Sequence, residues 1–419
     1  MGAVSLNVQS EIGKLEGVIL HKPGAEVENM TPQTAQRALY SDILNLSIAQ
    51  KEYEQLSGVL GRYTNVYYVE ELLKGVLDDY RQREKLIGHI CIEEGVTDYF
   101  DMLMEMPSGE LAKSLIEGVP ARVNTLTAYL NEEYYALYPL YNFYFTRDAS
   151  VTIGNNALVC RMANKVRMRE SLIMEAIFRS GAFNCNIINA HDFNPGNNDI
   201  FMEGGDILVA RNDILLVGNG TRTSTQGIDM LVSRLLRDRS EEKRHIIVQQ
   251  LPHSPESFIH LDMVFTLLDR DCCMVFEPLI LRNNQYQTVH MTLEGGRVTS
   301  IRGVPNLLSV LSDLGMDLKP VACGGCSDDW NQEREQWHSG ANFFAMEPGK
   351  VLSYARNVHT LAELDKNGYE IVSAWDVMNG KCRLEDYRKC VVTIDGSELP
   401  RGGGGARCMT MPVSRANIV

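Results

Sequence analysis

Residues 206–217 read Asp-Ile-Leu-Val-Ala-Arg-Asn-Asp-Ile-Leu-Leu-Val, and this stretch decides how the fold is organised. Two short apolar runs flank the polar turn Arg211-Asn212-Asp213, a pattern that predicts a β-hairpin. An apolar pattern of helical period follows at about residues 227–236. The stretch therefore predicts a unit of strand, turn, strand and amphipathic helix.

The same unit recurs along the chain. Apolar alternation and turn residues predict further hairpins at residues 149–160, 262–276 and 342–354, with turns at 154–156, 269–271 and 347–349. The helices that complete these units are expected at about 167–178, 304–314 and 361–367. A fifth unit is expected from a strand at 15–20, a helix at 48–60 and a strand at 391–394.

One segment breaks the pattern. Residues 69–130 carry long helical periodicity without a hairpin signal, and we interpret them as a helical insertion. The expected division is 1–68 for the first part of the catalytic fold, 69–135 for the insertion and 136–419 for the remainder. Because each repeated unit is too small to bury its own sheet face, five copies predict circular packing around a central pocket.

The composition restricts the class of partner. Of 419 residues, 44% are hydrophobic and 22% charged, as in an ordinary globular protein. The 40 basic and 54 acidic residues give a net charge of −14, which argues against nucleic acid and suits a cationic small molecule. No run approaches the roughly 18 apolar residues that span a membrane, so we expect no membrane partner. The first residues lack the pattern of a signal peptide.

The cysteines predict a reducing compartment. Ten of them are scattered without the spacing of a small disulfide framework, which favours reduced thiols and a cytoplasmic location. Cys323 and Cys326 have the spacing of a zinc or redox pair. Because no second Cys or His pair with ligand spacing accompanies them, we expect no metal site.

Acidic residues stand at the start of three predicted hairpins. They are Asp148, Glu203 with Asp206, and Asp262 two residues after His260. Residues two apart in a strand share a face, so a strand through 260–262 would point His260 and Asp262 to the same side. A histidine beside a carboxylate suits acid–base chemistry. Both residues also have a purely structural explanation. His260 could be a histidine at a strand end that hydrogen-bonds to its neighbour, and Glu203 could simply precede a turn.

Four glycines at 402–405 deliver Cys408 near the C-terminus. Glycine lets a chain pass close to a ligand, so this thiol is a candidate nucleophile at the rim of a pocket; the alternative is a flexible tail. Arg167, at the opening of a predicted helix, and Arg222, among glycine and hydroxyl residues, are candidates to hold a carboxylate or are solvated charges. Together these groups describe a site for an α-amino acid with a basic side chain.

Six motifs in this order resemble those of the arginine deiminases. This guanidine-modifying family has a five-bladed α/β propeller fold, and the resemblance covers nearly the whole chain. It implies five pseudo-symmetric ββαβ units with a helical insertion after the first blade. The motifs are Phe-Thr-Arg-Asp (145–148), Glu-Gly-Gly-Asp (203–206), Gly-Thr-Arg-Thr-Ser (220–224), His-Leu-Asp-Met-Val-Phe (260–265), Glu-Arg-Glu-Gln-Trp (333–337) and Cys-Met-Thr-Met-Pro (408–412).

The resemblance implies hydrolysis of L-arginine to L-citrulline and ammonia through a thiouronium intermediate, with no metal or organic cofactor. Cys408 would be the nucleophile, His260 the general acid and then the base, and Glu203 the partner of His260. Asp148 and Asp262 would clamp the guanidinium group. The implied substrate-binding residues are Asn142, Phe145, Arg167, Asp206, Arg222 and Gly403.

Two departures from the family pattern concern substrate recognition. Tyr40-Ser41-Asp42 stands where some relatives carry an aromatic residue and two aspartates, and Gly403 stands where some carry an arginine. Arg401 and Arg407 are the candidates to replace that arginine. A relative acting on another guanidino or ureido substrate, an amidinotransferase and a catalytically silent arginine-binding protein therefore remain alternatives. We expect L-arginine and water as small-molecule partners, and a homo-oligomer.

Overall fold

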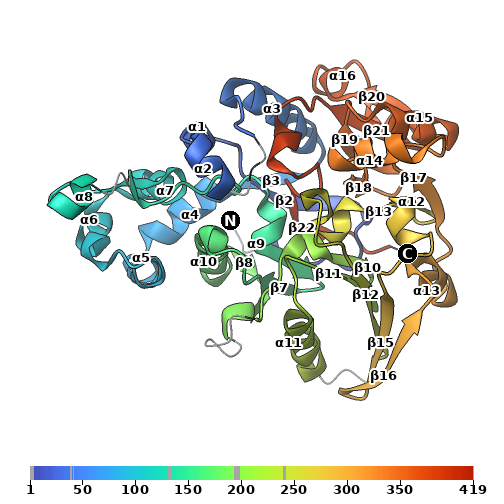
Figure 1. Ribbon diagram of the computed structural model, residues 1–419, viewed down its shortest axis with the longest axis horizontal. Helices are drawn as coiled ribbons and strands as arrows, with labels where there is room; N and C mark the ends of the chain where they lie inside the picture. The colour runs from blue at the N-terminus through green and yellow to red at the C-terminus, as the bar shows by residue number, and fades with distance from the viewer. Residues whose placement is uncertain are drawn as a thin grey trace.

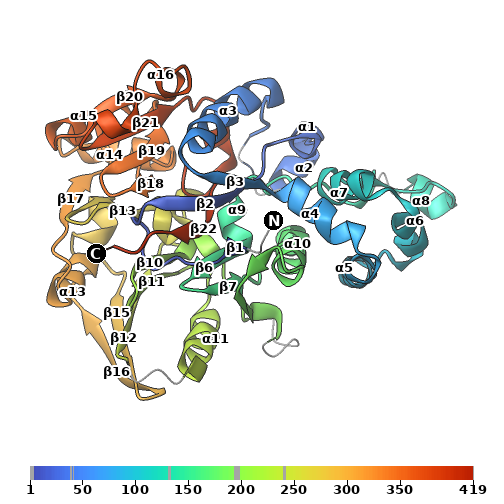
Figure 2. The ribbon, with the colours of Figure 1, turned by 180° about the vertical axis from the view of Figure 1, so that it is seen from behind.

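The computed structural model describes residues 4–37, 40, 42–130, 134–192, 199–238 and 242–418. They form a mixed α/β fold (Figure 1). Short sheets with their covering helices make up most of the molecule, and a group of helices extends to one side. Viewed from behind, the strands β2 and β22, which come from opposite ends of the chain, lie side by side (Figure 2).

The hairpin of residues 206–217 forms as expected. Strands β10 (Ile207–Arg211) and β11 (Ile214–Asn219) pair antiparallel, and β12 (Arg244–Gln250) pairs parallel with β11 after helix α11 (Thr225–Leu235). Nearly all side chains of β10 and β11 are buried, because both faces of the sheet are covered. Their apolar runs are therefore continuous and do not alternate with polar residues.

Four more sheets contain an antiparallel pair followed by a parallel strand. Two of them are β6 (Ser150–Ile153), β7 (Asn156–Val159) and β9 (Asn186–Asn189), with helix α10 (Met168–Arg179), and β13 (Phe265–Asp269), β14 (Cys272–Val275) and β17 (Lys319–Ala322). The others are β18 (Phe344–Glu347), β19 (Lys350–Tyr354) and β21 (Cys390–Ile394), with helix α15 (Val358–Lys366), and β22 (Met411–Arg415), β2 (Leu15–Leu20) and β3 (Asn65–Tyr68), with helix α3 (Leu46–Tyr63). The hairpins predicted at 149–160, 262–276 and 342–354 are confirmed.

A different strand from the expected one completes the fifth unit. Residues 391–394 belong to β21, which lies between β19 and β20 (Glu370–Ser373) and runs parallel to both. Their assignment to the fifth unit is therefore wrong. Strand β22 takes that place and pairs antiparallel with β2, with Met411 opposite Ile19. The continuous apolar run of β21 is that of a central strand, fully buried between two neighbours.

One hairpin lies outside the sequence-based expectations. Strands β15 (Thr288–Glu294) and β16 (Arg297–Val304) extend the sheet of β12. Their turn is formed by Gly295 and Gly296 at φ values of +60° and +73°, a left-handed geometry that favours glycine. The outer strand β16 is mostly exposed, so it lacks an apolar pattern. The following helix α13 (Leu307–Asp313) begins later than predicted, after a capping box at Asn306.

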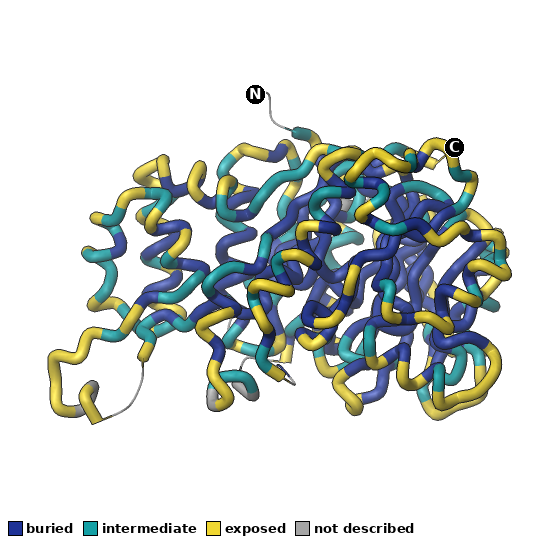
Figure 3. The backbone as a smooth tube through the Cα atoms, turned by 90° about the horizontal axis from the view of Figure 1, so that it is seen from above, coloured by how far each residue is buried: buried dark blue, intermediate teal, exposed yellow. Residues whose placement is uncertain are grey.

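The segment after β3 is helical, as expected. It contains α4 (Val69–Asp78), α5 (Tyr80–Glu93), α6 (Phe100–Glu105), α7 (Ser108–Glu117) and α8 (Leu126–Leu130). Helix α4 packs on α7, and both α4 and α5 contact α10, the helix between strands β7 and β9. Figure 3 shows that most buried backbone lies in the sheet-bearing part and that exposed residues are frequent at the far end of these helices. Within the described residues, no helix is long and apolar enough to cross a membrane.

Shorter elements connect these parts. Strand β1 (Val4–Ser5) pairs with β8 (Phe183–Asn184), and β4 (Val119–Pro120) pairs with β5 (Tyr135–Leu137). The remaining helices are α1 (Ala25–Glu28), α2 (Pro32–Arg37), α9 (Thr146–Ala149), α12 (Glu277–Ile280), α14 (Asp329–Trp337) and α16 (Ala374–Met378). Buried hydrophobic side chains between the sheets and helices form the core.

Met411 tests the corrected position of β22. Its side chain is fully buried in the largest hydrophobic cluster. Because truncation leaves a cavity, Met411→Ala is expected to lower the free energy of unfolding by about 2–5 kcal/mol in chemical denaturation. The control is Ile301→Ala in the exposed strand β16, where 64% of the residue is exposed and the change should stay within about 0.5 kcal/mol. Equal losses in the two variants would contradict a buried β22.

Candidate active site

Short helical turns directly before the first strands of three sheets carry the acidic residues. Asp148 lies in α9 before β6. Asp206 lies in the 3-10 turn Gly204–Asp206 before β10, and Asp262 lies in the 3-10 turn Leu261–Met263 before β13. All three carboxylates are buried. The turns thus bring acidic side chains from distant parts of the sequence to corresponding positions in three sheets.

His260 and Asp262 do not share a strand, contrary to the sequence-based expectation. His260 is extended, with φ −136° and ψ 157°, and the chain then enters the 3-10 turn. The N–H group of Leu261 donates to Oδ1 of Asp206 at 2.9 Å, so the backbone bonds to a neighbouring turn and not to a strand. The expectation that His260 and Asp262 lie on the same face of a strand is therefore wrong.

Cys408 is buried in a turn before β22, with 2% of the residue exposed. Its Sγ lies 3.2 Å from Nδ2 of Asn342 and 3.7 and 3.9 Å from the carboxylate oxygens of Asp262. The glycine run packs closely, because a β-carbon at Gly404 would lie 2.5 Å from the ring of Phe145. The segment is therefore a packed loop, and the alternative of a flexible tail is wrong.

His260 is enclosed by carboxylates. Its Nε2 lies 3.0 Å from Oε2 of Glu203, and its Nδ1 lies 3.7 Å from Oδ1 of Asp148. Gly205 allows this packing, since a β-carbon there would lie 2.4 Å from Nδ1. Burial disfavours the imidazolium, but Asp148, Glu203 and Asp206 outweigh it and raise the pKa of His260 to about 9. His260 is therefore protonated at neutral pH.

The thiol and the imidazole are both in their protonated forms. Burial raises the pKa of Cys408 well above its ordinary range, and the carboxylates of Asp262 and Asp148 raise it further, against the opposing effects of a backbone hydrogen bond at Gly405 and of the charge of Arg407. Cys408 is thus a neutral thiol in this site. A cation that entered between these carboxylates would favour the thiolate.

The predicted substrate-binding arginines contact the acidic groups. Nη1 of Arg167 lies 2.8 Å from Oδ2 of Asp148 and 3.7 Å from Oε2 of Glu203. Its other nitrogens bond to the carboxylate of Glu170 at 2.8–3.2 Å. Arg222 lies 3.5 Å from Oε1 of Glu203. Their role toward a substrate carboxylate stays a prediction.

Arg407 and Arg401 occupy different environments. Arg407 is buried and donates to Oδ2 of Asp262 at 2.7 Å and to both carboxylate oxygens of Glu11 at 3.0 Å. Arg401 has 43% of its side chain exposed and lies 2.5 Å from Oδ2 of Asp42. Of the two candidates to replace an arginine at position 403, Arg401 is therefore the one that lies near the surface.

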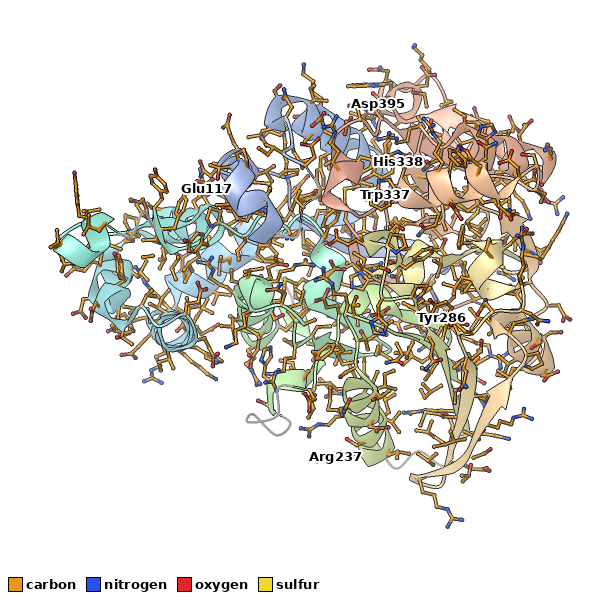
Figure 4. The ribbon with its side chains drawn as sticks, in the orientation of Figure 1. Glu117, Arg237, Tyr286, Trp337, His338 and Asp395 are labelled. Atoms are coloured by element: carbon orange, nitrogen blue, oxygen red, sulfur yellow. The ribbon has the colours of Figure 1, made fainter. Side chains whose placement is uncertain are left out.

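A pocket of about 290 Å³ lies beside the glycine run. Its walls include Arg222, Arg401 and Gly403, together with Trp337 and His338 at the end of α14 (Figure 4). Gly403 has a φ of +84°, which favours glycine, although a β-carbon there would meet open space. The pocket thus reaches two predicted substrate-binding residues, whereas Cys408 and His260 do not line it.

The other predicted residues surround the same centre. The ring of Phe145 packs on Tyr144 with centroids 4.2 Å apart, and the carbonyl of Asn142 accepts a bond from Arg167 at 3.4 Å. Burial raises the pKa of Asp206 to about 6. Of the stretch Tyr40-Ser41-Asp42, Ser41 lies outside the described residues.

One group of side chains has metal-ligand geometry. Within the described residues, only Asp148, Glu203 and His260 bring suitable atoms within 4.8 Å of one another. The guanidinium groups of Arg167 and Arg222 lie within 4 Å of the same carboxylates and supply positive charge there. The donor set therefore fits a network of ion pairs better than a resident cation.

Comparison with known proteins decides the family. The profile described as "Arginine deiminase" matches residues 36–415. The arginine deiminase of Mycoplasma capricolum is 32% identical over 426 aligned residues, covering 99% of this chain and 98% of the relative. That of Bacillus cytotoxicus is 31% identical over 436 residues, covering 99% of each chain. The chain belongs to the arginine deiminase family.

Solved structures of more distant proteins share the fold. The N-terminal domain of ArgZ bound to product, from a cyanobacterial arginine dihydrolase, gives a TM-score of 0.53 at 13% identity and covers 95% of this chain and 97% of that chain. The amidinotransferase SxtG of Microseira wollei gives a TM-score of 0.52 at 13% identity, covering 99% and 98%. At this level of identity, the two structures show only that they share the fold of this arginine deiminase family member.

Asn342, Glu11 and Glu170 of this arginine deiminase family site were missed from the sequence, and Arg407 was considered only as a replacement for an arginine at position 403. Asn342 contacts the thiol, Arg407 contacts Asp262, and Glu11 and Glu170 pair with the site arginines. Only Asn342 carried a usable signal, since it starts the fourth predicted hairpin just as Asp148 starts the first. The pairing of Glu11 with Arg407 joins residues 396 positions apart, and no local pattern indicates it.

Helix α3 anchors the segment that leads to the glycine run. The buried carboxylate of Glu52 accepts the N–H groups of Ser397, Glu398 and Leu399 at 2.6, 3.1 and 2.9 Å. Oε2 of Glu398 in turn accepts the N–H group of Asn45 at 2.8 Å. These bonds satisfy the backbone at the start of the 3-10 turn Leu399–Gly402 and fix where the glycine run begins.

Glu52→Gln tests this anchor. The amide keeps one acceptor oxygen but loses the charge that strengthens three buried hydrogen bonds, so the free energy of unfolding should fall by about 2 kcal/mol in chemical denaturation. Glu54→Gln on the same helix is the control, because Glu54 is half exposed and pairs with Lys22 at the surface. If Glu52→Gln matched this control, the anchor would have no measurable strength.

Proposed function

We propose that the protein is an arginine deiminase that hydrolyses L-arginine to L-citrulline and ammonia through a covalent intermediate on Cys408. Two buried polar atoms without a hydrogen-bond partner carry the proposal: Oδ1 of Asp148 and Nδ1 of His260. Buried polar groups are normally paired, so each exception calls for an explanation, and a bound ligand that donates to Asp148 would be one. A planar guanidinium has five N–H donors and would supply the donor that Asp148 lacks.

Two arginines of the chain determine which carboxylate oxygens are available. Arg167 holds Oδ2 of Asp148, and Arg407 holds Oδ2 of Asp262. Each aspartate therefore offers Oδ1 to a substrate guanidinium that lies close to Sγ of Cys408. The family resemblance assigns the α-carboxylate and amino end to Asn142, Arg167 and Arg222, with Phe145 on the guanidinium plane; Gly403, together with Arg401, would border the entrance.

In the first half of the reaction, the thiolate of Cys408 replaces ammonia. As the guanidinium enters, the thiol releases its proton to solvent, and the thiolate forms a C–S bond with the guanidinium carbon. Protonated His260 gives its proton to one nitrogen of the tetrahedral adduct, the C–N bond breaks, and ammonia leaves. A cationic thiouronium and a neutral imidazole remain. The pKa of about 9 keeps His260 protonated for this step at neutral pH.

In the second half, water replaces the sulfur. Neutral His260 takes a proton from water, and the hydroxide adds to the thiouronium carbon. The C–S bond breaks, the hydroxyl proton of the adduct returns to the sulfur, and citrulline leaves. The thiol and the imidazolium are restored, and the proton released at binding accounts for the ammonium formed in solution. Glu203 stabilises the imidazolium at each stage.

We also propose that the five sheets form a five-bladed α/β propeller interrupted by a helical insertion at 69–135, between 1–68 and 136–419. Contacts between successive turns support this arrangement. Gly204 closely approaches the carbonyl of Arg147, and the N–H group of Leu261 donates to Asp206 at 2.9 Å. The side chain of Asn342 donates to the carbonyl of Asp262 at 3.1 Å and accepts the N–H group of Arg407 at 2.9 Å. The N–H group of Arg147 donates to the carbonyl of Cys408 at 3.1 Å.

A cytoplasmic location is proposed because all ten cysteines are free thiols. The homo-oligomeric state stays a prediction.

Turnover of arginine tests the proposed function. The protein incubated with L-arginine is expected to release ammonia and citrulline in equal amounts, and Cys408→Ala should abolish both, because the sulfur forms the intermediate. Cys326→Ala is the matched control, since Cys326 is an exposed thiol outside the site. Agmatine, citrulline and glycine as an amidino acceptor are tested in parallel. Turnover of agmatine or citrulline in place of arginine, transfer of the amidino group from arginine to glycine in place of hydrolysis, or binding of arginine without products would reject the proposal.

Alkylation of Cys408 tests its electrostatic environment. Iodoacetamide incorporation into the Cys408 peptide, followed by mass spectrometry between pH 6 and 10, should be slow at pH 7 because burial and the carboxylates raise the thiol pKa. When the wild-type protein is saturated with guanidinium ion, the pH profile of Cys408 alkylation should move to lower pH by about one unit or more, since the cation neutralises those carboxylates. A thiolate already formed near pH 6 in the free protein would contradict this account.

A further inference from the structure

Asn342 follows a turn at residues 338–341 and precedes the first strand of the fourth sheet. It lies two residues before β18 starts, and Asp148, Asp206 and Asp262 lie one to three residues before the first strands of their sheets. Its residue is 1% exposed. The fourth turn therefore brings a neutral amide to the place where the three others bring a carboxylate.

Both polar atoms of the Asn342 side chain contact the segment Arg407-Cys408. Oδ1 accepts the N–H groups of Arg407 at 2.9 Å and Cys408 at 3.3 Å. Nδ2 lies 3.2 Å from Sγ of Cys408 and 3.1 Å from the carbonyl oxygen of Asp262. Gly405 makes room for the amide, because a β-carbon there would lie 2.7 Å from Oδ1.

These contacts fix which way the amide points. Two backbone N–H groups require the oxygen on one side, and a carbonyl requires the NH₂ group on the other. A flipped amide would lose all three bonds. The NH₂ group is therefore held against the sulfur by contacts that do not involve the sulfur.

We infer that Asn342 is a catalytic residue whose Nδ2 donates a hydrogen bond to the sulfur of Cys408 and stabilises the thiolate. The inference rests on the proposed function, because it concerns the attacking state of the same thiol. A hydrogen bond to an ionised group is stronger than one to its neutral form, so the donor favours the thiolate over the thiol.

The surrounding groups explain what a further neutral donor contributes. Asp262 and Asp148 act against a thiolate, whereas a backbone hydrogen bond at Gly405 and the charge of Arg407 favour it, and Arg407 is already paired with Asp262 and Glu11. Asn342 adds a donor at the sulfur without adding a positive charge that would repel a guanidinium. An aspartate in its place would keep an acceptor for the two N–H groups and bring a third carboxylate to the thiolate.

The test compares Asn342→Asp with Asn357→Asp. Asn357 is also buried to 1% exposure, and its Nδ2 bonds to the carbonyl of His338 at 3.1 Å, away from the sulfur. The readout is the pH profile of Cys408 alkylation by iodoacetamide, resolved by peptide mass spectrometry with guanidinium ion present. Asn342→Asp should move the profile up by at least about one pH unit, a tenfold loss of thiolate at fixed pH. Asn357→Asp should leave it in place.

An unshifted profile in Asn342→Asp, or an equal shift in both variants, overturns the inference. If Asn342→Asp fails to fold, which rapid labelling of the buried cysteines would reveal, Asn342→Ala is used, and it should shift the profile in the same direction. Because alkylation needs no turnover, it decides the role of Asn342 even if the wild-type protein releases no citrulline. With arginine as substrate, Asn342→Ala should lower kcat at least tenfold and change KM less than threefold.

Discussion

The buried ion pairs of Arg407 are the interaction on which the rest of the site depends. Its guanidinium bonds to Glu11 near the N-terminus, to Asp262 and to the carbonyl of Ile207, and its own backbone precedes Cys408. A charge this deeply buried is tolerated only when it is paired and hydrogen-bonded, so all of these segments must be in place together. The pairing with Arg407 lowers the pKa of Glu11 to about 2 against the opposing effect of burial. The site therefore stays connected through the whole range of neutral and mildly acidic pH.

The same principle of shared charge shapes the reactive centre. Arg167 neutralises part of the charge of Asp148, as Arg407 does for Asp262, and each leaves one oxygen of its aspartate beside the reactive groups. The remaining negative charge keeps the imidazole protonated and the thiol neutral. In the proposed mechanism, this resting state is unreactive toward neutral molecules. A substrate cation would change it, because the charge that holds the substrate also releases the proton of the nucleophile.

The sequence was informative where a structural signal is local. Turn residues between apolar runs located the hairpins at 149–160, 206–217, 262–276 and 342–354, because turn geometry and strand burial depend on neighbouring residues. Strand identity in the fifth unit failed, since 391–394 is an apolar run whereas 411–415 contains a proline, a serine and an arginine, and only its pairing with β2 identifies it as the strand. The exposed strand β16 lacked apolar alternation. The resemblance named the groups that meet in the site, but neither the role of Asn342 nor the pairing of Arg407 with Asp262 was recognised, because these contacts join residues 65 or more positions apart.

The position of Cys408 follows from how the turns contact one another. Cys408 is held by Asn342 of the fourth sheet on one side, and its carbonyl accepts the N–H group of Arg147 from the first turn on the other. Strand β22, which follows the thiol directly, pairs with β2 from the start of the chain. The thiol therefore reaches its place only when the last strand has paired with the first sheet elements. The acidic groups of the site come from the other turns, so the site is complete only when β22 pairs with β2 and brings Cys408 among them.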